Sequence, residues 1–355
     1  MKKTLKKLKQ FFKKNYLSVI LFTSLFIISF SATFIYFYRQ RDFVKNEEGP
    51  ITEETASITL PEDDPTTNVI LLGMGGPGHE GATLTDTNIL VRINTQDKKA
   101  AIITIPRDLW VPIPSGNERT TFNKLNKAYA LGGGELSKDV ISAVTGLRVD
   151  KFIAVDFVGF QRIFGLLGGI KVNVPKDYDD YFYPLKGKEL ELCGLSPEKM
   201  QEVHEKYSGF ELEKQFECRF EHIHFEKGEM KMEGEVALKY VRSRHGNDGG
   251  DFGRSERQTV VLEGLKEKLI SLEIVKKSPK LLDAIIKNVK TDITLDEIKD
   301  FYDLVGNSDE YEITTVHLTE DNVLTSSNGL NGFILLPKEG NNQWKEIREF
   351  IYNNL

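Results

Sequence analysis

The sequence predicts a single α/β domain, and three observations support this prediction. Short apolar runs that end near Gly or Pro alternate with longer segments of helical periodicity from Asn68 to the C-terminus. The 22 Phe and 12 Tyr supply more apolar surface than a disordered chain carries. An uncharged stretch near the N-terminus lies outside this pattern and is long enough to cross a membrane. We therefore expect one folded domain attached to one transmembrane helix.

The N-terminal region predicts a membrane anchor. Residues 1–15 contain seven Lys and no acidic residue, and residues 16–38 contain no charge. A helix over 16–38 matches the roughly 30 Å hydrocarbon core of a bilayer. The basic tail predicts a cytoplasmic N-terminus and an extracytoplasmic main domain at the cell membrane. The alternative is a cleaved signal peptide, which Ser29, Ser31 and Ala32 leave open, although the apolar region of such a peptide is usually about 7–15 residues long.

The charge balance restricts the possible partners. Residues 39–67 are acidic, polar and contain Pro, which predicts a stalk between the membrane and a domain at 68–355. Nine of the 47 basic residues precede Asp42, which leaves 38 basic against 53 acidic residues in the exported part. Nucleic-acid binding requires a basic surface, so this composition argues against a nucleic-acid partner.

The order of elements follows from apolar periodicity and from turn residues. Strands are predicted at 69–72, 89–94, 100–106, 152–156, 170–174, 240–244, 311–318 and 332–336. The turn 95–98 predicts that the second and third of these form a hairpin. Helices are predicted at 122–131, 136–145, 157–167, 233–239, 254–272, 278–289, 294–305 and 343–354. The helix at 294–305 opens with Thr294 and Glu297, which form the pattern of a capping box.

Residues 176–228 interrupt this rhythm. They are rich in Glu and Lys and contain both cysteines of the chain, Cys193 and Cys218. We interpret the segment as an insertion in the core domain. Outside the cytoplasm the two cysteines could pair, and their number and spacing indicate neither a disulfide framework nor a zinc site.

The segment 239–258, KYVRSRHGNDGGDFGRSERQ, carries the strongest chemical signal. Side chains two apart on a strand share a face, so the predicted strand places Arg242 and Arg244 side by side. Adjacent guanidinium groups repel each other, and Arg is suited to bidentate recognition of phosphate. The pair therefore predicts a bound anion.

The helix that follows strengthens the prediction. Its apolar stripe continues toward the N-terminal end through Gln258 and Arg254, so the buried face becomes polar where the helix begins. That end carries the positive end of the helix dipole. The alternative is an exposed strand and helix with ordinary salt bridges to Asp248, Asp251 and Glu256. Charges on a buried face are rarely left unpaired, which favours the anion site.

Weaker candidates lie at the ends of other strands. Arg107 and Asp108 follow a strand in the sequence IPRD, and ligands of open α/β sheets bind beyond the carboxyl ends of strands. Asp86 precedes a strand and is a natural Mg²⁺ ligand beside a phosphate. Lys124 could add a charge to the same phosphates. The alternatives are a strand-end salt bridge for Arg107, a turn or cap for Asp86 and a solvated surface position for Lys124.

Three further residues have open roles. His79 and Glu80 lie in the Gly-rich loop after the first strand, at a spacing that is not diagnostic of a metal site. Asp251 could be a metal ligand, a general base or the partner that orients an arginine. The sequence offers no Ser/His/Asp or Cys/His arrangement for nucleophilic catalysis, and phosphoryl transfer requires none.

Five separated motifs together resemble the LytR-CpsA-Psr family. They are LTDTNILVRIN, ITIPRD, KLNKAYALGGG, FVGFQRIFGLLGGIKVNVP and LKYVRSRHGNDGGDFGRSERQ. The resemblance runs from about residue 66 to the C-terminus, without 176–228. It implies a central mixed β-sheet flanked by helices, with a hydrophobic groove under the sheet for the tail of a polyprenyl pyrophosphate.

The resemblance also implies an activity. A Mg²⁺-dependent phosphotransferase would move a glycopolymer, such as teichoic acid or capsular polysaccharide, from a polyprenyl-pyrophosphate carrier to a peptidoglycan sugar hydroxyl. The residues implied to be catalytic are Arg107, Asp108, Arg242, Arg244, Asp251 and Arg254. Those implied to hold the pyrophosphate are Arg107, Lys124, Arg242, Arg244, Arg254 and Gln258, and Asp86 is the implied metal ligand.

The sequence departs from the family pattern at two positions. Many members have an aspartate where this chain has Gly75 and an arginine where it has Leu84. The metal shell is then one carboxylate short and the phosphate cluster one positive charge short. This departure keeps two alternatives open, a lipid-pyrophosphate-binding scaffold or regulator without turnover, and a pyrophosphatase in which water replaces the acceptor.

Overall fold

The computed structural model describes residues 66–79, 81–115, 119–247, 251–271, 278–305, 310–329 and 332–355. The predicted transmembrane helix at 16–38 and nearly all of the predicted stalk lie outside these residues. Among the helices described, none has the length and apolar character needed to cross a bilayer. The described residues from Thr66 to Leu355 belong to one compact unit.

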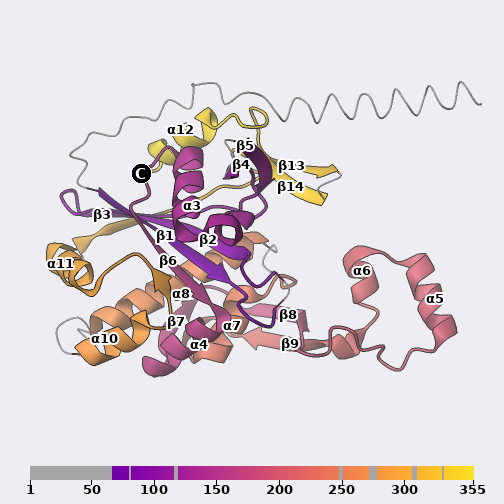
Figure 1. Cartoon of the computed structure of the whole chain (residues 1–355). Helices are drawn as coiled ribbons and strands as arrows, with labels where there is room; N and C mark the ends of the chain where they lie inside the picture. The colour runs from indigo at the N-terminus through magenta and orange to yellow at the C-terminus, as the bar shows by residue number, and fades with distance from the viewer. Residues whose placement is uncertain are drawn as a thin grey trace, which may run out of the picture. The chain divides into compact units, whose positions relative to one another are not determined.

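The centre of the domain is a mixed six-stranded sheet in the order β11-β6-β1-β2-β3-β12 (Figure 1). Its strands are β1 (Thr66–Met74), β2 (Thr85–Asn94), β3 (Lys99–Thr104), β6 (Lys151–Asp156), β11 (Lys290–Thr291) and β12 (Glu312–His317). β1 pairs with β2 antiparallel and with β6 parallel. The predicted hairpin of the second and third strands is confirmed.

Four two-stranded ribbons and a set of helices surround this sheet (Figure 1). The ribbon strands are β4 (Trp110–Ser115), β5 (Arg119–Lys124), β7 (Ile170–Val174), β8 (Tyr178–Pro184), β9 (Phe220–Phe225), β10 (Gly228–Met232), β13 (Leu324–Gly329) and β14 (Gly332–Pro337). The helices are α3 (Lys127–Thr145), α4 (Phe157–Leu166), α5 (Pro197–Lys206), α6 (Gly209–Glu213), α7 (Gly234–Arg242), α8 (Asp251–Ser271), α10 (Pro279–Ile286), α11 (Leu295–Val305) and α12 (Lys345–Asn353), with a 3₁₀ turn at Glu217–Arg219.

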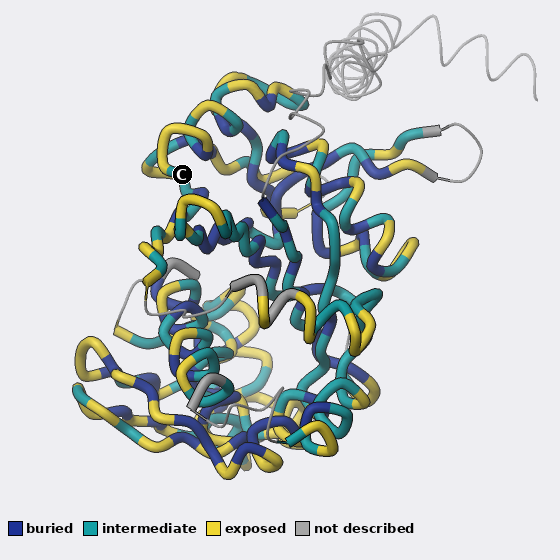
Figure 2. The backbone as a smooth tube through the Cα atoms, turned by 90° about the vertical axis from the view of Figure 1, so that its left-hand side faces the viewer, coloured by how far each residue is buried: buried dark blue, intermediate teal, exposed yellow. Residues whose placement is uncertain are grey.

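The sheet separates two apolar layers. Successive residues of a strand point to opposite faces, and the burial of β1 alternates accordingly. Ile70 and Leu72 are fully buried in the core that also holds α3 and α12. The opposite face is covered by α4, α7, α8 and α10, whose apolar residues form a second cluster. In Figure 2 the exposed positions, in yellow, lie mainly on loops and on the outer turns of helices.

One close contact fixes the position of α8 against the ribbon of β7 and β10. A Cβ at Gly264 would lie 2.3 Å from the carbonyl oxygen of Lys171, so only glycine permits this approach. Val261, one turn earlier, is buried in the second cluster. The middle of α8 is thereby held against this ribbon.

Two predicted elements around the site are wrong. Residues 240–244 do not form a strand, because α7 continues to Arg242 and the chain is extended from Ser243. Ala237, Leu238 and Tyr240 are buried on one side of this helix, which explains its extra turn. Arg242 and Arg244 therefore do not share a strand face.

The second error concerns residues 122–131. The first part of this segment is strand β5, which ends at Lys124, and α3 begins at Lys127. The helix then kinks at Gly132 and Gly133, where a break between two helices was predicted. The ribbon of β4 and β5 was missed because Pro112 and Pro114 interrupt the strand pattern, and proline is tolerated in such edge positions.

The predicted insertion at 176–228 is too wide. Its ends form the hairpin of β8 and β9, whose residues Tyr178, Tyr183, Ile223 and Phe225 belong to the second core cluster. The segment that leaves the core is 185–219, which we call the excursion. It carries α5 and α6 beyond the end of this hairpin (Figure 1).

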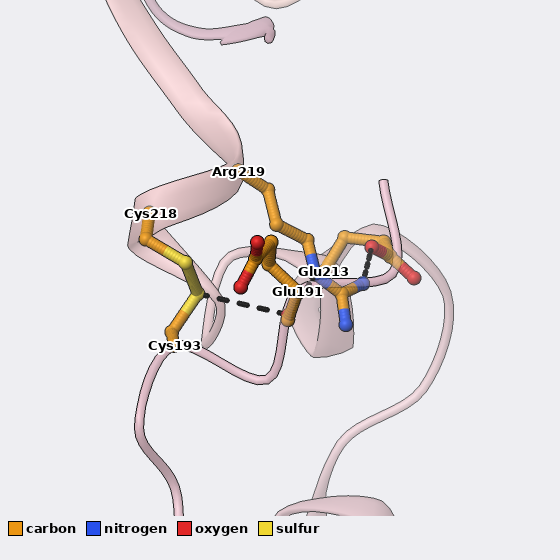
Figure 3. The surroundings of a disulfide bond; sticks show 5 residues. All are labelled: Glu191, Cys193, Glu213, Cys218 and Arg219. Carbon is orange, nitrogen blue, oxygen red and sulfur yellow. Dashed lines mark hydrogen bonds and ion pairs between the residues drawn. A yellow bond between two sulfur atoms is a disulfide. The ribbon is translucent and has the colours of Figure 1, made fainter. Parts of the chain in front are cut away.

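The excursion is closed at its base. The proposed pairing of Cys193 with Cys218 is confirmed as a disulfide (Figure 3). Next to it, Arg219 donates to the carbonyl of Glu191 at 2.8 Å and forms an ion pair with Glu213 at 2.9 Å. A covalent link across a loop of this length restricts the unfolded chain and favours the folded excursion.

The capping box of α11 generates a prediction about pH. The Glu297 carboxylate accepts from Lys151 Nζ at 2.6 Å and from the Thr294 backbone N–H at 2.8 Å, and these bonds lower its pKa to about 2. A depressed carboxyl pKa stabilises the fold above the pKa of the unfolded chain, and this stabilisation disappears as pH falls through the folded value. Glu297→Gln should therefore lower the Tm at pH 7, and the difference from the native chain should shrink between about pH 4.5 and about pH 2.

Asp296→Asn is the matched control for thermal unfolding, because Asp296 lies in the same helical turn and its side chain is 88% exposed. It should change the Tm little at any pH. If Glu297→Gln lowered the Tm by the same amount at pH 7 and at pH 2.5, this result would contradict the low pKa of Glu297.

Candidate functional site

A cavity of about 930 Å³ lies between the sheet and the helices of the second cluster. Apolar side chains from β1, β2, β6, α4, α8 and α10 form most of its wall, among them Val69, Leu71, Ile89, Val91, Ile153, Val155, Phe160, Leu262, Leu265, Leu269, Ile285 and Ile286. It extends along β1 from Thr67 to Met74, a distance of about 23 Å for an extended strand. Its shape and lining suit a long hydrocarbon chain.

One end of the cavity is strongly polar. Here β1 and β6 end at Met74 and Asp156, and β2 begins beside them, since Met74 is paired with Thr85. The residues that line this end include Asp86, Asp156, Asp180, Tyr183, Arg242, Arg244, His245, Arg254 and Gln258. Five of the predicted site residues are therefore brought to one place. We call this end the mouth of the cavity.

Arg242 is held at the mouth by two aromatic residues. Its guanidinium carbon lies 4.1 Å from the centre of the Phe157 ring, which is within the range of a cation–π contact. It also donates to the hydroxyl of Tyr183 at 3.3 Å. Burial raises the pKa of Tyr183, so this hydroxyl stays neutral at pH 7. The charge of Arg242 is thus positioned by groups that do not neutralise it.

Arg254 and Gln258 reach the mouth from the first turns of α8. Arg254 is 9% exposed and donates to the backbone carbonyl of Asp86 at 3.4 Å. Gln258, one turn later, donates to Thr87 Oγ1 at 2.9 Å. The structure confirms that both residues continue the inward face of this helix. Their contacts attach the start of α8 to the start of β2.

Asp86 begins a chain of alternating charges. Its carboxylate is ion-paired with Arg107, which also donates through Nε to Asp108 at 3.3 Å. Lys124 Nζ lies 2.7 Å from the other oxygen of Asp108. Asp108 is buried, whereas about a quarter of each cationic side chain is exposed. Arg107, Asp108 and Lys124 do not line the cavity, so they adjoin the mouth through Asp86.

These ion pairs decide between the alternatives that the sequence left open for Arg107 and Lys124. The strand-end ion pair considered for Arg107 is present, and Lys124 is a paired strand residue and not a solvated surface lysine. Asp251 begins α8, but its side chain lies outside the described positions.

The described residues at the mouth offer few ligands for a metal ion. Within the described ranges, no three His, Cys, Asp or Glu side chains are grouped so that they could hold a metal ion. Asp156 lines the mouth but caps α4, since its Oδ1 accepts from the Gly159 backbone N–H at 2.7 Å. Asp86 offers one carboxylate that is already paired with Arg107. This set fits only an ion that takes most of its ligands from phosphate and water, as Mg²⁺ does.

A buried network beneath the mouth was missed from the sequence. Asp180 is 1% exposed and accepts from the hydroxyl of Ser243, from the backbone N–H of His245 at 3.2 Å and from that of Phe182 at 2.8 Å. Arg257 is 2% exposed and donates to the backbone carbonyls of Tyr240, at 2.7 Å, and Ser243. These bonds fix the chain on both sides of Arg242 and Arg244.

The sequence carried only a weak signal for this network. Asp180 stands in YDDYFYP, inside the segment interpreted as an insertion, and two of its partners, Ser243 and His245, lie more than 60 residues away. Arg257 follows Arg254 by three residues and was not singled out from the sequence. Its guanidinium stacks on Tyr178 at 4.2 Å and faces the protein interior.

The chain is similar to known proteins over most of its length. The polyisoprenyl-teichoic acid–peptidoglycan teichoic acid transferase TagU of Enterococcus faecalis is 26% identical over 79% of this chain and 78% of that protein. The enzyme of the same description from Bacillus subtilis, TagV, is 28% identical over 68% of this chain, which spans about half (54%) of TagV.

Solved structures share the fold. The crystal structure of B. subtilis TagV superposes with a TM-score of 0.57 at 23% identity, over 82% of this chain and 98% of that one. A second structure, TagT (YwtF) with bound octaprenyl pyrophosphate lipid, gives a TM-score of 0.51 at 21% identity, over 84% and 95% of the two chains.

The model of the LytR_cpsA_psr family matches residues 33–349, which is most of the chain. The match includes the segment 176–228, which was left out of the resemblance stated from the sequence motifs. The chain belongs to the LytR_cpsA_psr family.

Proposed function

We propose that this chain transfers a glycopolymer from a polyprenyl-pyrophosphate carrier to a sugar hydroxyl of peptidoglycan. One observation carries the proposal: a long apolar cavity ends at a mouth that gathers Arg242, Arg244 and Arg254. A molecule with a hydrocarbon tail and a pyrophosphate head matches both parts. The activity named for the TagU and TagV relatives supports the same class of reaction.

The apolar part of the cavity would bind the hydrocarbon tail of the carrier lipid. Burial of a hydrocarbon chain contributes about 0.8 kcal/mol for each CH₂ group removed from water. Several isoprene units along the wall would therefore hold the carrier without any polar contact. The tail would lie under the sheet with its head at the mouth, where the apolar wall ends.

The mouth of the cavity would bind the pyrophosphate head group. Arginine binds phosphate oxygens in a bidentate geometry, and three arginines line this end of the cavity. The first turn of α8 contributes the positive end of its helix dipole at the same place. Arg107 and Lys124 extend the positive charge toward the outside, although Asp86 and Asp108 offset part of it.

The proposed reaction is an in-line displacement at phosphorus. The acceptor oxygen forms a new bond to the phosphorus that carries the glycan, and the bond from this phosphorus to the bridging oxygen breaks. The electron pair leaves with the bridging oxygen on polyprenyl phosphate. Fixed guanidinium groups stabilise the charge that develops on the phosphate oxygens, which is the main requirement of such transfers.

We also propose that the protein uses Mg²⁺ as a cofactor. Asp86 would hold it with one carboxylate oxygen, and substrate phosphates and water would supply the other ligands. The ion would neutralise phosphate charge. Gly75 and Leu84 bring neither a further carboxylate nor a further cation to this site, so we expect weak affinity for the metal in the absence of substrate.

We also propose a location for the protein. The segment 16–38 would anchor the chain as a single-pass protein with its N-terminus in the cytoplasm. The domain would then face the peptidoglycan acceptor. The Cys193–Cys218 disulfide supports this location, because disulfides persist mainly in oxidising compartments outside the cytoplasm.

The first experiment follows release of polyprenyl phosphate from a polyprenyl-pyrophosphate-linked glycan, with Mg²⁺ and with peptidoglycan fragments as acceptor. Arg242→Ala should lower kcat/KM by about 100-fold or more, since loss of one preorganised donor costs that much in related chemistry. Asp86→Ala should lower the rate and weaken its dependence on Mg²⁺. Arg148→Ala is the control, because Arg148 is exposed and pairs with Asp150 away from the mouth.

The outcomes separate the candidate functions. Turnover that depends on both Mg²⁺ and acceptor supports the transferase. Turnover without acceptor would indicate a pyrophosphatase. Tight binding of the lipid without turnover would indicate a scaffold or regulator, the function that the departures at Gly75 and Leu84 favour.

The buried network generates a second prediction. Asp180→Asn removes the charge that accepts bonds from Ser243 and His245, which should lower the free energy of unfolding by about 1–3 kcal/mol. It should also lower kcat/KM by about tenfold, because the arginines at the mouth lose their fixed position. Asp179→Asn, at the neighbouring half-buried position, changes a carboxylate that pairs with His222 and His224 and not with Ser243 or His245, and it should change both quantities less. Equal effects of the two substitutions in denaturant unfolding and turnover would contradict this role.

A further inference from the structure

A histidine stands beside the mouth, outside the lipid cavity. His79 belongs to the Gly-rich loop that follows β1. The loop is closed by two backbone bonds, from Gly76 N–H to the carbonyl of Ala82 at 2.9 Å and from His79 N–H to that of Gly76 at 3.2 Å. Gly76 has a φ of +78°, a conformation that favours glycine. The loop therefore turns back and holds His79 in place.

The ring of His79 packs on a residue of the mouth. It lies edge-to-face against Phe157, with 5.0 Å between ring centres. Phe157 lines the cavity, and the guanidinium carbon of Arg242 lies 4.1 Å from the centre of its ring. One aromatic ring thus positions both the imidazole and a proposed phosphate ligand.

The packing of His79 depends on Gly75. A Cβ added at position 75 would lie 2.9 Å from the Cβ of His79, closer than real contacts allow. The glycine that departs from the family pattern is therefore the residue that makes room for this histidine.

The imidazole is a base at neutral pH. Partial burial, followed by the positive charges of Arg242 and Lys186, lowers the pKa of His79 below its ordinary value of 6.5, and Glu189 opposes them. Lys186 and Glu189 belong to the root of the 185–219 excursion. His79 thus lies within electrostatic reach of this root.

The carboxylates at the mouth are engaged in other contacts. Asp86 is paired with Arg107, Asp156 caps α4, and Asp180 accepts bonds from three donors. A general base needs a lone pair that is available near the operating pH. Two described imidazoles remain at this end. The ring of His245 is stacked on Phe210 at 3.6 Å, whereas that of His79 meets Phe157 edge-to-face at 5.0 Å, so His79 is the better candidate for the base.

We propose that His79 is the general base that accepts the proton of the attacking sugar hydroxyl. This inference rests on the proposed transferase function. As the acceptor oxygen bonds to phosphorus, its proton passes to an imidazole nitrogen of His79, and the bridging P–O bond breaks with its electron pair on polyprenyl phosphate. The imidazolium then returns the proton to water or to the departing phosphate.

The test uses the full chain and the glycopolymer-transfer assay. His79→Gln should lower kcat by about 100-fold, the lower end of the range for general-base catalysis, with unchanged affinity for a polyprenyl pyrophosphate. The native pH–rate profile should fall on its acidic side as His79 becomes protonated, and the variant should lose this fall. Imidazole added to His79→Ala should restore part of the rate. His204→Gln, an exposed histidine on α5, is the control and should match the native protein.

The outcomes distinguish two failures. A native chain without acceptor-dependent turnover would overturn the transferase itself. If the native chain turns over, a His79→Gln variant that keeps the native rate and pH profile would overturn the base assignment alone. A variant that loses lipid binding together with turnover, without rescue by imidazole, would assign His79 a packing role and would also overturn the proposal.

Discussion

The structure depends on one strand that must bury both of its faces. β1 carries apolar side chains at successive positions, so neither face of the sheet can be left in water. One face is closed by α3 and α12, which fill the space against Ile70 and Leu72. The other is covered by α4, α7, α8 and α10, which leave a cavity beside Val69 and Leu71. The same apolar pattern that folds the domain also forms the proposed lipid site.

The charges at the mouth require a rigid frame, because neighbouring guanidinium groups repel each other and α7 ends just before Ser243. The buried carboxylate of Asp180 and the buried guanidinium of Arg257 supply this frame from two different elements. Breaking one partner of a buried polar network leaves the other uncompensated. The hairpin of β8 and β9 is therefore part of the site, and the excursion it carries adjoins the mouth through Phe210, whose ring stacks on His245 at 3.6 Å.

Much of this architecture could be predicted from local patterns. The β2–β3 hairpin and the inward face of Arg254 and Gln258 follow from periodicity and turn residues. The pairing of the cysteines follows from the predicted location outside the cytoplasm. The strand assigned to 240–244 and the helix assigned to Lys124 were wrong, because burial of Tyr240 and the β4–β5 ribbon override local preference. Asp180 and the packing of His79 on Phe157 could not be predicted, since each depends on contacts between segments more than 60 residues apart.

The most direct test of the account is a crystal structure of the chain with a bound polyprenyl pyrophosphate. We expect the hydrocarbon chain between β1 and α8, beside Val69, Leu71 and Leu265, and the pyrophosphate within hydrogen-bond distance of Arg242, Arg244 and Arg254. Lipid bound elsewhere, with the cavity filled by side chains, would contradict the proposed site. A pyrophosphate held mainly by Arg107 and Lys124, outside the mouth, would contradict the assignment of the head group.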